Sequence, residues 1–221
     1  MQTEESLEER LKAGYEESKI EKNIEVRKKR AQEWYEIGLK REDPEQKAAC
    51  LELAVDFGLS NADIFSELGL VHYKSGHWDK AVEYFKKTIK ENPKHVLAHA
   101  RLGLSYSHKG KYRKAVGFCK KAIKLDPRSS TAHEHLGYVY YQHRFFGNAI
   151  KSFQDALDVN PNNAWVYYHL GNTYMLMKEF DKAIECHKKA VEINPKFEIA
   201  RNAFNHLQEL KKKGSLKTEE I

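Results

Sequence analysis

The sequence predicts an all-α protein: a right-handed α-solenoid, or superhelix, of antiparallel helix pairs. Four of the five prolines in its 221 residues stand 34 residues apart, at Pro93, Pro127, Pro161 and Pro195. Because proline ends helices, a fixed interval between prolines is typical of a repeat protein. Apolar residues recur three and four positions apart, which is helical spacing, and no stretch shows the sustained alternation of a strand.

Other residue types keep the same register of 34 residues. A leucine–glycine pair recurs in each unit, and an alanine follows it at a fixed distance. A glycine inside a helix costs about 1 kcal/mol relative to alanine, so its recurrence predicts a close approach by the partner helix. A large side chain there should cost about 1–3 kcal/mol. The pairs are Leu68 and Gly69, Leu102 and Gly103, Leu136 and Gly137, and Leu170 and Gly171; the alanines are Ala81, Ala115, Ala149 and Ala183.

Each unit contains two expected helices. In 96–129, His99, Leu102 and Tyr106 are spaced three and four apart and therefore share a helix face. The Lys-Gly-Lys turn at 109–111 breaks that helix. The second helix starts near Tyr112 and ends before Pro127.

The register divides the chain into units and flanking segments. The flanking segments are a charged, partly helical N-terminal extension, a degenerate and shortened helix pair, a C-terminal capping helix and a disordered tail. In order, the segments are 1–30 (extension), 31–61 (degenerate pair), the units 62–95, 96–129, 130–163 and 164–197, then 198–213 (cap) and 214–221 (tail).

A helix in the N-terminal extension has two interpretations. Ile20, Ile24, Ala31 and Trp34 can share one helix face, although Arg27 interrupts the stripe. The helix could pack on the first repeat of its own chain. Alternatively, it could bind a partner or a second copy and form a homo-oligomer.

The repeated pattern resembles the tetratricopeptide repeat (TPR), and the resemblance covers 62–197. Some positions depart from the usual pattern without breaking the register: Arg144 and Lys178 stand where the turn usually has glycine, and Cys119 and His187 replace an aromatic of the second helix. The pattern is plainest in 164–197, at Tyr167, Leu170, Gly171, Tyr174, Phe180, Ala183, Ala190 and Pro195.

The resemblance implies a concave groove that binds partner peptides. The groove would be lined by positions 2, 5, 9 and 12 of each first helix, which share a face. Chaperone-binding TPR modules clamp a terminal carboxylate with Lys, Arg and Asn, and only Asn172 fits here, so this is not expected to be such a clamp. The candidate groove residues are Leu70, Tyr73, Leu104, Tyr138, Tyr141, Trp165, Tyr168, Asn172 and Met175.

The aromatic members of this set, Tyr138, Tyr141, Trp165 and Tyr168, are the candidate anchors for a partner. Large aromatic side chains contribute most to interface energetics. The alternative is that tyrosine is simply common at these positions of the repeat. Trp165 is the least typical of the four and therefore the sharpest candidate.

The net charge of +6 is concentrated in one unit. The unit 96–129 has nine basic residues and one acidic residue, a balance of +8, so the rest of the chain sums to −2. This could be a solvated face, or a patch that binds an acidic protein, an anionic membrane surface or nucleic acid. The scarcity of free aromatics beside it disfavours nucleic acid. The patch residues are Lys86, Lys87, Lys109, Lys111, Arg113, Lys114, Lys120, Lys121 and Lys124.

No pattern indicates catalysis, a cofactor or a metal. Phosphate-binding, dinucleotide-binding, zinc-protease, hydrolase and Cys-x-x-Cys patterns are missing from the sequence, so no catalytic residue is expected. His95 and His99 have metal-ligand spacing, but His95 should precede the helix. Three cysteines favour a reducing compartment. With no apolar spanning stretch and no signal sequence, we expect a cytoplasmic protein that could attach peripherally to a membrane.

These observations favour a non-enzymatic scaffold or adaptor that binds partner segments in an apolar, aromatic groove and could assemble into multiprotein complexes. Stand-alone TPR proteins of this size resemble bacterial assembly scaffolds, including those on organelle or magnetosome membranes, which is an analogy of fold. The alternative function is binding of an anionic membrane surface or nucleic acid through 96–129.

Overall fold

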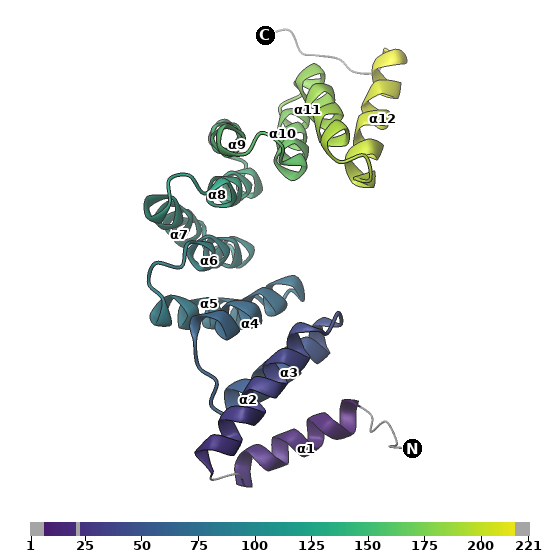
Figure 1. Ribbon diagram of the computed structural model, residues 1–221. Coiled ribbons are helices and arrows are strands. Elements are labelled where there is room, and N and C mark those ends of the chain that lie inside the picture. Colours follow the sequence, from purple (N-terminus) through teal and green to yellow (C-terminus); the bar gives the residue numbers. More distant parts are fainter. Residues whose placement is uncertain (1–6, 21–22, 215–221) are drawn as a thin grey trace. The chain divides into compact units, whose positions relative to one another are not determined.

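The computed structural model describes residues 7–20 and 23–214, and these fall into two compact units that divide between Ala98 and His99. The described residues contain helices and no strand, as the sequence predicts (Figure 1). The right-handed twist of the solenoid stays a prediction. Among the described residues, no helix has both the length and the apolar character needed to span a membrane.

The first unit holds five complete helices and the start of α6 (Figure 1). Two consecutive antiparallel pairs, α2 with α3 and α4 with α5, follow the N-terminal helix. The bounds are α1 Leu7–Ile20, α2 Ile24–Leu39, α3 Pro44–Asp56, α4 Ala62–Lys74 and α5 Trp78–Glu91, and α6 is Val96–His108.

The second unit begins within α6 and repeats one design. A first helix and a second helix pack side by side, a short turn joins them, and the next first helix follows a loop that contains proline. The bounds are α7 Tyr112–Leu125, α8 Ser130–Gln142, α9 Phe146–Val159, α10 Ala164–Leu176, α11 Phe180–Ile193 and α12 Glu198–Lys212.

The N-terminal helix packs within the first unit. A Cβ built on Gly14 of α1 would lie 2.9 Å from the indole of Trp34 and 3.1 Å from Leu53. The Arg10 guanidinium lies 5.9 Å from the centre of the Trp34 ring, and Leu11 packs on the same core. α1 therefore packs on α2 and α3 of its own chain, the pair that precedes the first repeat.

The expected stripe of Ile20, Ile24, Ala31 and Trp34 on one helix is wrong. α1 ends at Ile20, and α2 begins at Ile24 with Asn23 as its N-cap, whose side chain accepts from the amides of Glu25 and Val26. Ile24 is 68% exposed. Since α2 begins at Ile24, the expected boundary at residue 31 falls inside this helix. The expected disorder of 214–221 lies, apart from Gly214, outside the described residues.

The interhelical glycines make the expected close approach. A Cβ on Gly137 would lie 2.6 Å from the ring of Phe153, and one on Gly171 would lie 2.8 Å from the imidazole of His187. Both distances are shorter than van der Waals contact, so a larger residue would force the paired helices apart.

Two non-glycine residues adopt the turn conformation of glycine. Gly76 and Gly110 have φ of 75° and 69° in the turns between paired helices, and Arg144 and Lys178 have φ of 63° and 62° at the equivalent positions. The left-handed region costs a residue with a Cβ about 1–2 kcal/mol. The surrounding repeat therefore imposes the turn even where its sequence departs from glycine.

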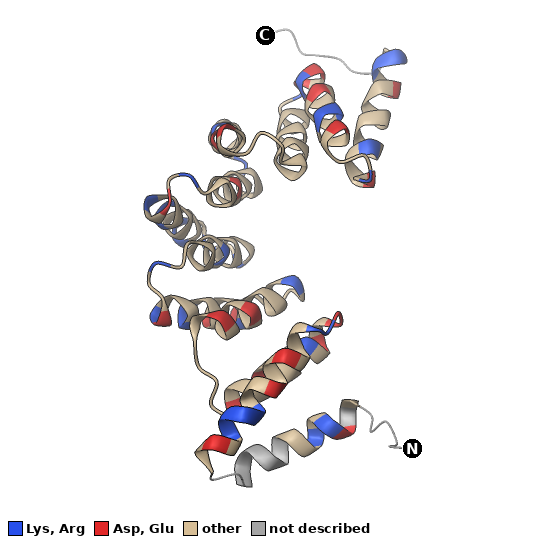
Figure 2. Ribbon diagram, viewed as in Figure 1, with Lys and Arg blue, Asp and Glu red and all other residues tan. Residues whose placement is uncertain are grey.

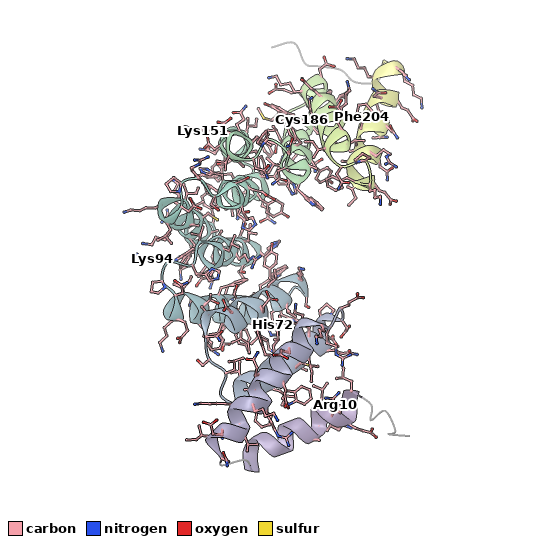
Figure 3. All side chains as sticks on the ribbon, viewed as in Figure 1. Arg10, His72, Lys94, Lys151, Cys186 and Phe204 are labelled. Atoms are coloured by element: carbon pink, nitrogen blue, oxygen red, sulfur yellow. The ribbon has the colours of Figure 1, made fainter. Side chains whose placement is uncertain are left out.

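A polar contact joins α3 to α4 and α5 in the first unit. His72, labelled in Figure 3, stacks on Tyr84 with a centroid distance of 5.4 Å, and its Nε2 lies 3.3 Å from Glu52 Oε1. The hydrogen bond from His72, together with Lys80, lowers the pKa of Glu52 despite its burial. His72 thus has a charged partner in the neighbouring helix pair.

Candidate functional site

A continuous set of aromatic rings lies on the first helices of the second unit. We call it the aromatic row. α8 supplies Tyr138 and Tyr141, α10 supplies Trp165, Tyr168 and His169, and the loop before α12 supplies Phe197.

Ring contacts connect the two helices. Tyr138 stacks on Tyr141 at 6.1 Å between centroids and meets His169 edge-on at 5.1 Å. His169 stacks in turn on Trp165 at 6.0 Å. The four anchor candidates chosen from the sequence are therefore joined in one surface, and His169 is the ring that joins them.

Phe197 forms the other end of the row. Its ring lies 4.4 Å from Trp165 and 5.4 Å from Tyr168, and Phe197 itself is 7% exposed. Trp165, by contrast, is 51% exposed. The buried Phe197 ring thus packs against the indole of Trp165, while about half of the Trp165 side chain stays exposed to solvent. A partner can therefore contact an indole whose position is already fixed.

None of the six residues of the row is an aspartate, glutamate, lysine or arginine, and one glutamate lies beside the row. Burial lowers the pKa of His169 to about 4, so its imidazole is neutral. Burial and then the neighbouring Tyr138 and Tyr168 raise the pKa of Tyr141, so its hydroxyl stays protonated and can donate a hydrogen bond. The surface therefore combines apolar ring area with a few neutral polar groups.

The neighbouring carboxylate belongs to Glu134 of α8. Asn163 Nδ2 donates to its Oε2 at 2.9 Å, and Asn163 Oδ1 accepts from the Trp165 amide at 3.0 Å. Burial raises the pKa of Glu134, and the bond from Asn163 opposes that shift in part. One amide side chain thus ties this carboxylate to the first turn of α10.

The other groove candidates have different surroundings. Asn172 and Met175 are half-buried on α10. Leu104 is only 6% exposed, so it contributes to packing more than to a surface. Leu70 and Tyr73 are half-buried on α4 of the first unit, where Tyr73 meets Trp78 at 5.2 Å.

Sequence reasoning missed His169 and Phe197. Phe197 occupies the N-cap of α12, whereas Asn61, Ser129 and Asn163 cap the preceding first helices with their side chains. A cap position lies outside the helical pattern, so periodicity gave it no role. An aromatic residue where the other units have a polar cap was the available signal.

A second surface is the basic side of α7 (Figure 2). Six cations are exposed there, and within the described part of the chain none of them pairs with a carboxylate; Lys114 lies over the ring of Tyr106 at 5.5 Å. Lys109 is half-buried. The six are Lys111, Arg113, Lys114, Lys120, Lys121 and Lys124.

Lys86 and Lys87 lie on α5 of the first unit. Lys87 Nζ lies 2.7 Å from Glu83 and 4.8 Å from the centre of the Tyr84 ring. Its charge is therefore partly compensated within its own unit, unlike the charges on α7.

Two cysteines of the second unit and the metal-binding residue types are further candidates for a chemical site. Burial raises the pKa of Cys119 to about 12, and burial, with Glu185 adding to it, raises that of Cys186 to about 12, so both are thiols rather than nucleophilic thiolates. Among the described residues, no cluster of three or more His, Cys, Asp or Glu is arranged to hold a metal ion.

Comparison with known families and structures gives consistent matches. Family models described as tetratricopeptide repeat match 66–130 and 164–197, and one described as TPR repeat matches 146–178. No curated protein matches the chain.

Solved structures resemble this chain over most of its length. TTC0263, a thermophilic TPR protein of Thermus thermophilus, is 21% identical, with a TM-score of 0.73 over 81% of this chain and 100% of that chain. MamA is 31% identical, with a TM-score of 0.55 over 70% of this chain and 83% of that chain. YrrB, described as a TPR protein with an unusual peptide-binding site, is 18% identical, with a TM-score of 0.57 over 90% and 97%. The likenesses to TTC0263 and YrrB concern the fold.

Proposed function

The chain belongs to the tetratricopeptide repeat family, and from that premise we propose that it is a non-enzymatic scaffold that binds segments of partner proteins along the aromatic row. TPR proteins typically act by binding proteins rather than by catalysis. The finer statement, that the row is the binding surface, rests on its chemistry. It offers apolar area on rigid helices, which is where binding energy concentrates in protein interfaces.

One observation carries the proposal: Trp165 is half-exposed while its neighbours are held in place. Exposed apolar side chains that stand alone are common, whereas an exposed ring that continues into other rings is typical of an interaction site. Here Phe197 and His169 fix its orientation on two sides. Ile199, one register of 34 residues after Trp165, is also exposed, at 55%. Exposed apolar residues thus recur at the same register position on α10 and α12.

The occupant is a segment with apolar or aromatic anchors. A terminal carboxylate would meet no set of converging cations on this surface, since α6, α8 and α10 carry one arginine and no lysine within their bounds. An apolar anchor gains from burial against Trp165 and Tyr168 without needing a charged partner.

The test is selection of peptides from a displayed random library on the full chain, followed by affinity measurements on variants. Replacing Trp165 and Tyr168 together by alanine should weaken binding by at least about 2 kcal/mol, or roughly thirtyfold. Phe145→Ala is the matched control, because Phe145 is an aromatic residue that is 46% exposed and lies outside the row. Equal affinities for the double variant and the wild type would refute the proposal, provided circular dichroism shows both folded.

A second candidate function is favoured by the unpaired cations of α7. They could bind an anionic membrane surface or an acidic protein. Replacing Lys120, Lys121 and Lys124 by glutamine should abolish binding to vesicles with anionic lipids and flatten its salt dependence. The matched control replaces Lys182, Lys188 and Lys189 of α11, which are also exposed but are paired with glutamates. If vesicle binding depends neither on salt concentration nor on either set of three lysine replacements, this function is excluded.

A further inference from the structure

We infer that the aromatic row accepts a partner segment in which a lysine or arginine lies beside the apolar anchor, and that Glu134 binds this cation. The inference rests on the proposed function and adds to it the charge of the partner.

Glu134 stands at the edge of the row. It precedes Tyr138 by four residues on α8, so the two side chains share a helix face. Through the Asn163 amide it is also linked to the backbone of Trp165. The carboxyl group is therefore hydrogen-bonded to the residue that caps α10, and on α8 it lies one helical turn from Tyr138.

The carboxyl group of Glu134 has no cationic partner among the residues that the structure describes. Glu134 is the one acidic residue within the bounds of α6, α8 and α10. In this part of the chain its partner is the neutral amide of Asn163, and no cation pairs with it. The one arginine on these helices, Arg101, lies close enough to His135 to influence its titration. A carboxylate can accept several more hydrogen bonds than this one.

A cationic side chain satisfies both parts of this surface. Its charged end would form a charge-assisted hydrogen bond with Glu134 and offset the cost of burying that carboxylate. Its aliphatic stem would lie along the apolar rings, and the neighbouring rings of Tyr138 and Trp165 attract a cation by their π-electrons. A neutral anchor alone leaves the carboxylate without compensation, and an acidic segment is repelled by it.

The experiment compares peptides selected from a displayed random library on the wild-type full chain and on Glu134→Gln. Glutamine keeps an oxygen that can accept the Asn163 bond, so the fold is preserved while the charge is lost. The wild type should select apolar residues with a nearby lysine or arginine. Glu134→Gln should keep the apolar preference and lose the basic one. Asp158→Asn, an exposed acidic position on α9, is the matched control and should select as the wild type does.

A second measurement needs no change to the protein. In a selected peptide, replacement of the lysine by norleucine should weaken binding to the wild type about tenfold or more, and should hardly affect binding to Glu134→Gln. Equal losses in both proteins would overturn the inference, as would selection without any basic preference.

The two proposals fail in different ways. If the selected peptides bind equally to the variant lacking Trp165 and Tyr168, the row is not the binding surface and the proposed function fails. If binding requires those two residues and ignores Glu134, the row binds its partner without the cation, and only the further inference fails.

Discussion

The third and fourth repeats, 130–163 and 164–197, have the same arrangement of paired helices. They differ in the ring that they bury and in the side chains that they expose. In both, a glycine of the first helix meets a ring of the second: Gly137 meets Phe153, and Gly171 meets His187. In both, a non-glycine residue closes the turn with a left-handed φ. The buried rings differ in one respect, because both imidazole nitrogens of His187 are buried and have no hydrogen-bond partner among the described residues.

The exposed faces of these two repeats differ more. The third repeat places Thr131, Glu134, Tyr138 and Tyr141 at the groove positions, and the fourth places Trp165, Tyr168, Asn172 and Met175 at the same positions. The fold is thus maintained by a few buried register positions, while the groove positions are free to differ. This freedom allows two adjacent repeats to form one surface from unlike residues.

The largest expected effect comes from removing the buried ring of the third repeat. Phe153 is fully buried, so Phe153→Ala should lower the free energy of unfolding by about 3–5 kcal/mol through the cavity it leaves. Chemical denaturation checks this, with Gln154→Ala as the exposed control on the same helix. A loss of stability below about 1 kcal/mol would contradict the claim that Phe153 is fully buried at this position of the repeat.

The corresponding change in the fourth repeat should have the opposite sign. His187→Phe restores the ring of the third repeat and removes two unsatisfied nitrogen atoms, so stability should rise by about 1–2 kcal/mol. Thermal and denaturant unfolding at pH 7 measure the change. A marked loss of stability would show that the site beneath Gly171 has adapted to the smaller imidazole.

The same histidine predicts a dependence on pH. Burial lowers the pKa of His187 from 6.5 to about 4, so below pH 6.5 the unfolded chain binds a proton that the folded chain does not. The contribution of the neutral His187 to the free energy of unfolding is therefore fully present above pH 6.5 and is lost as the pH falls toward 4. His187→Phe should reduce the slope of stability against pH in this window by up to about 1.4 kcal/mol per pH unit. An unchanged slope would mean that His187 is protonated, or solvated, in the folded chain.

The smallest effect concerns the turns. Lys178→Gly should raise the free energy of unfolding by about 0.5–1 kcal/mol, because glycine adopts the left-handed conformation without strain. Lys188→Gly, in the interior of α11, should instead lower it by about 1 kcal/mol. If both changes destabilise the protein equally, the turn stores no strain.

The sequence predicted the paired helices closely because each repeat encodes the same packing again. The glycine, alanine and proline positions are set by local sterics, so their spacing alone locates helix pairs and the contacts at Gly137 and Gly171. The four aromatic anchor candidates share helix faces because residues three and four apart do so. That this face binds a partner was implied by the resemblance to the tetratricopeptide repeat, and it stays a prediction.

The rest depends on contacts that spacing does not encode. Phe197 reaches Trp165 from a loop, and Asn163 links Glu134 of one repeat to the next, so neither follows from the pattern within a single helix. The break between Ile20 and Ile24 was missed because apolar spacing continues across it, whereas the cap at Asn23 decides where α2 begins.

The most direct test of the central claim is the indole NMR signal of Trp165. The chain has three tryptophans, and their side-chain N–H signals can be assigned by replacing each with phenylalanine. Titration with a selected peptide should shift the signal of Trp165 and leave that of Trp34, which is 7% exposed in the first unit, in place. A saturable complex in which the Trp165 signal does not move would contradict the claim that the aromatic row binds the partner.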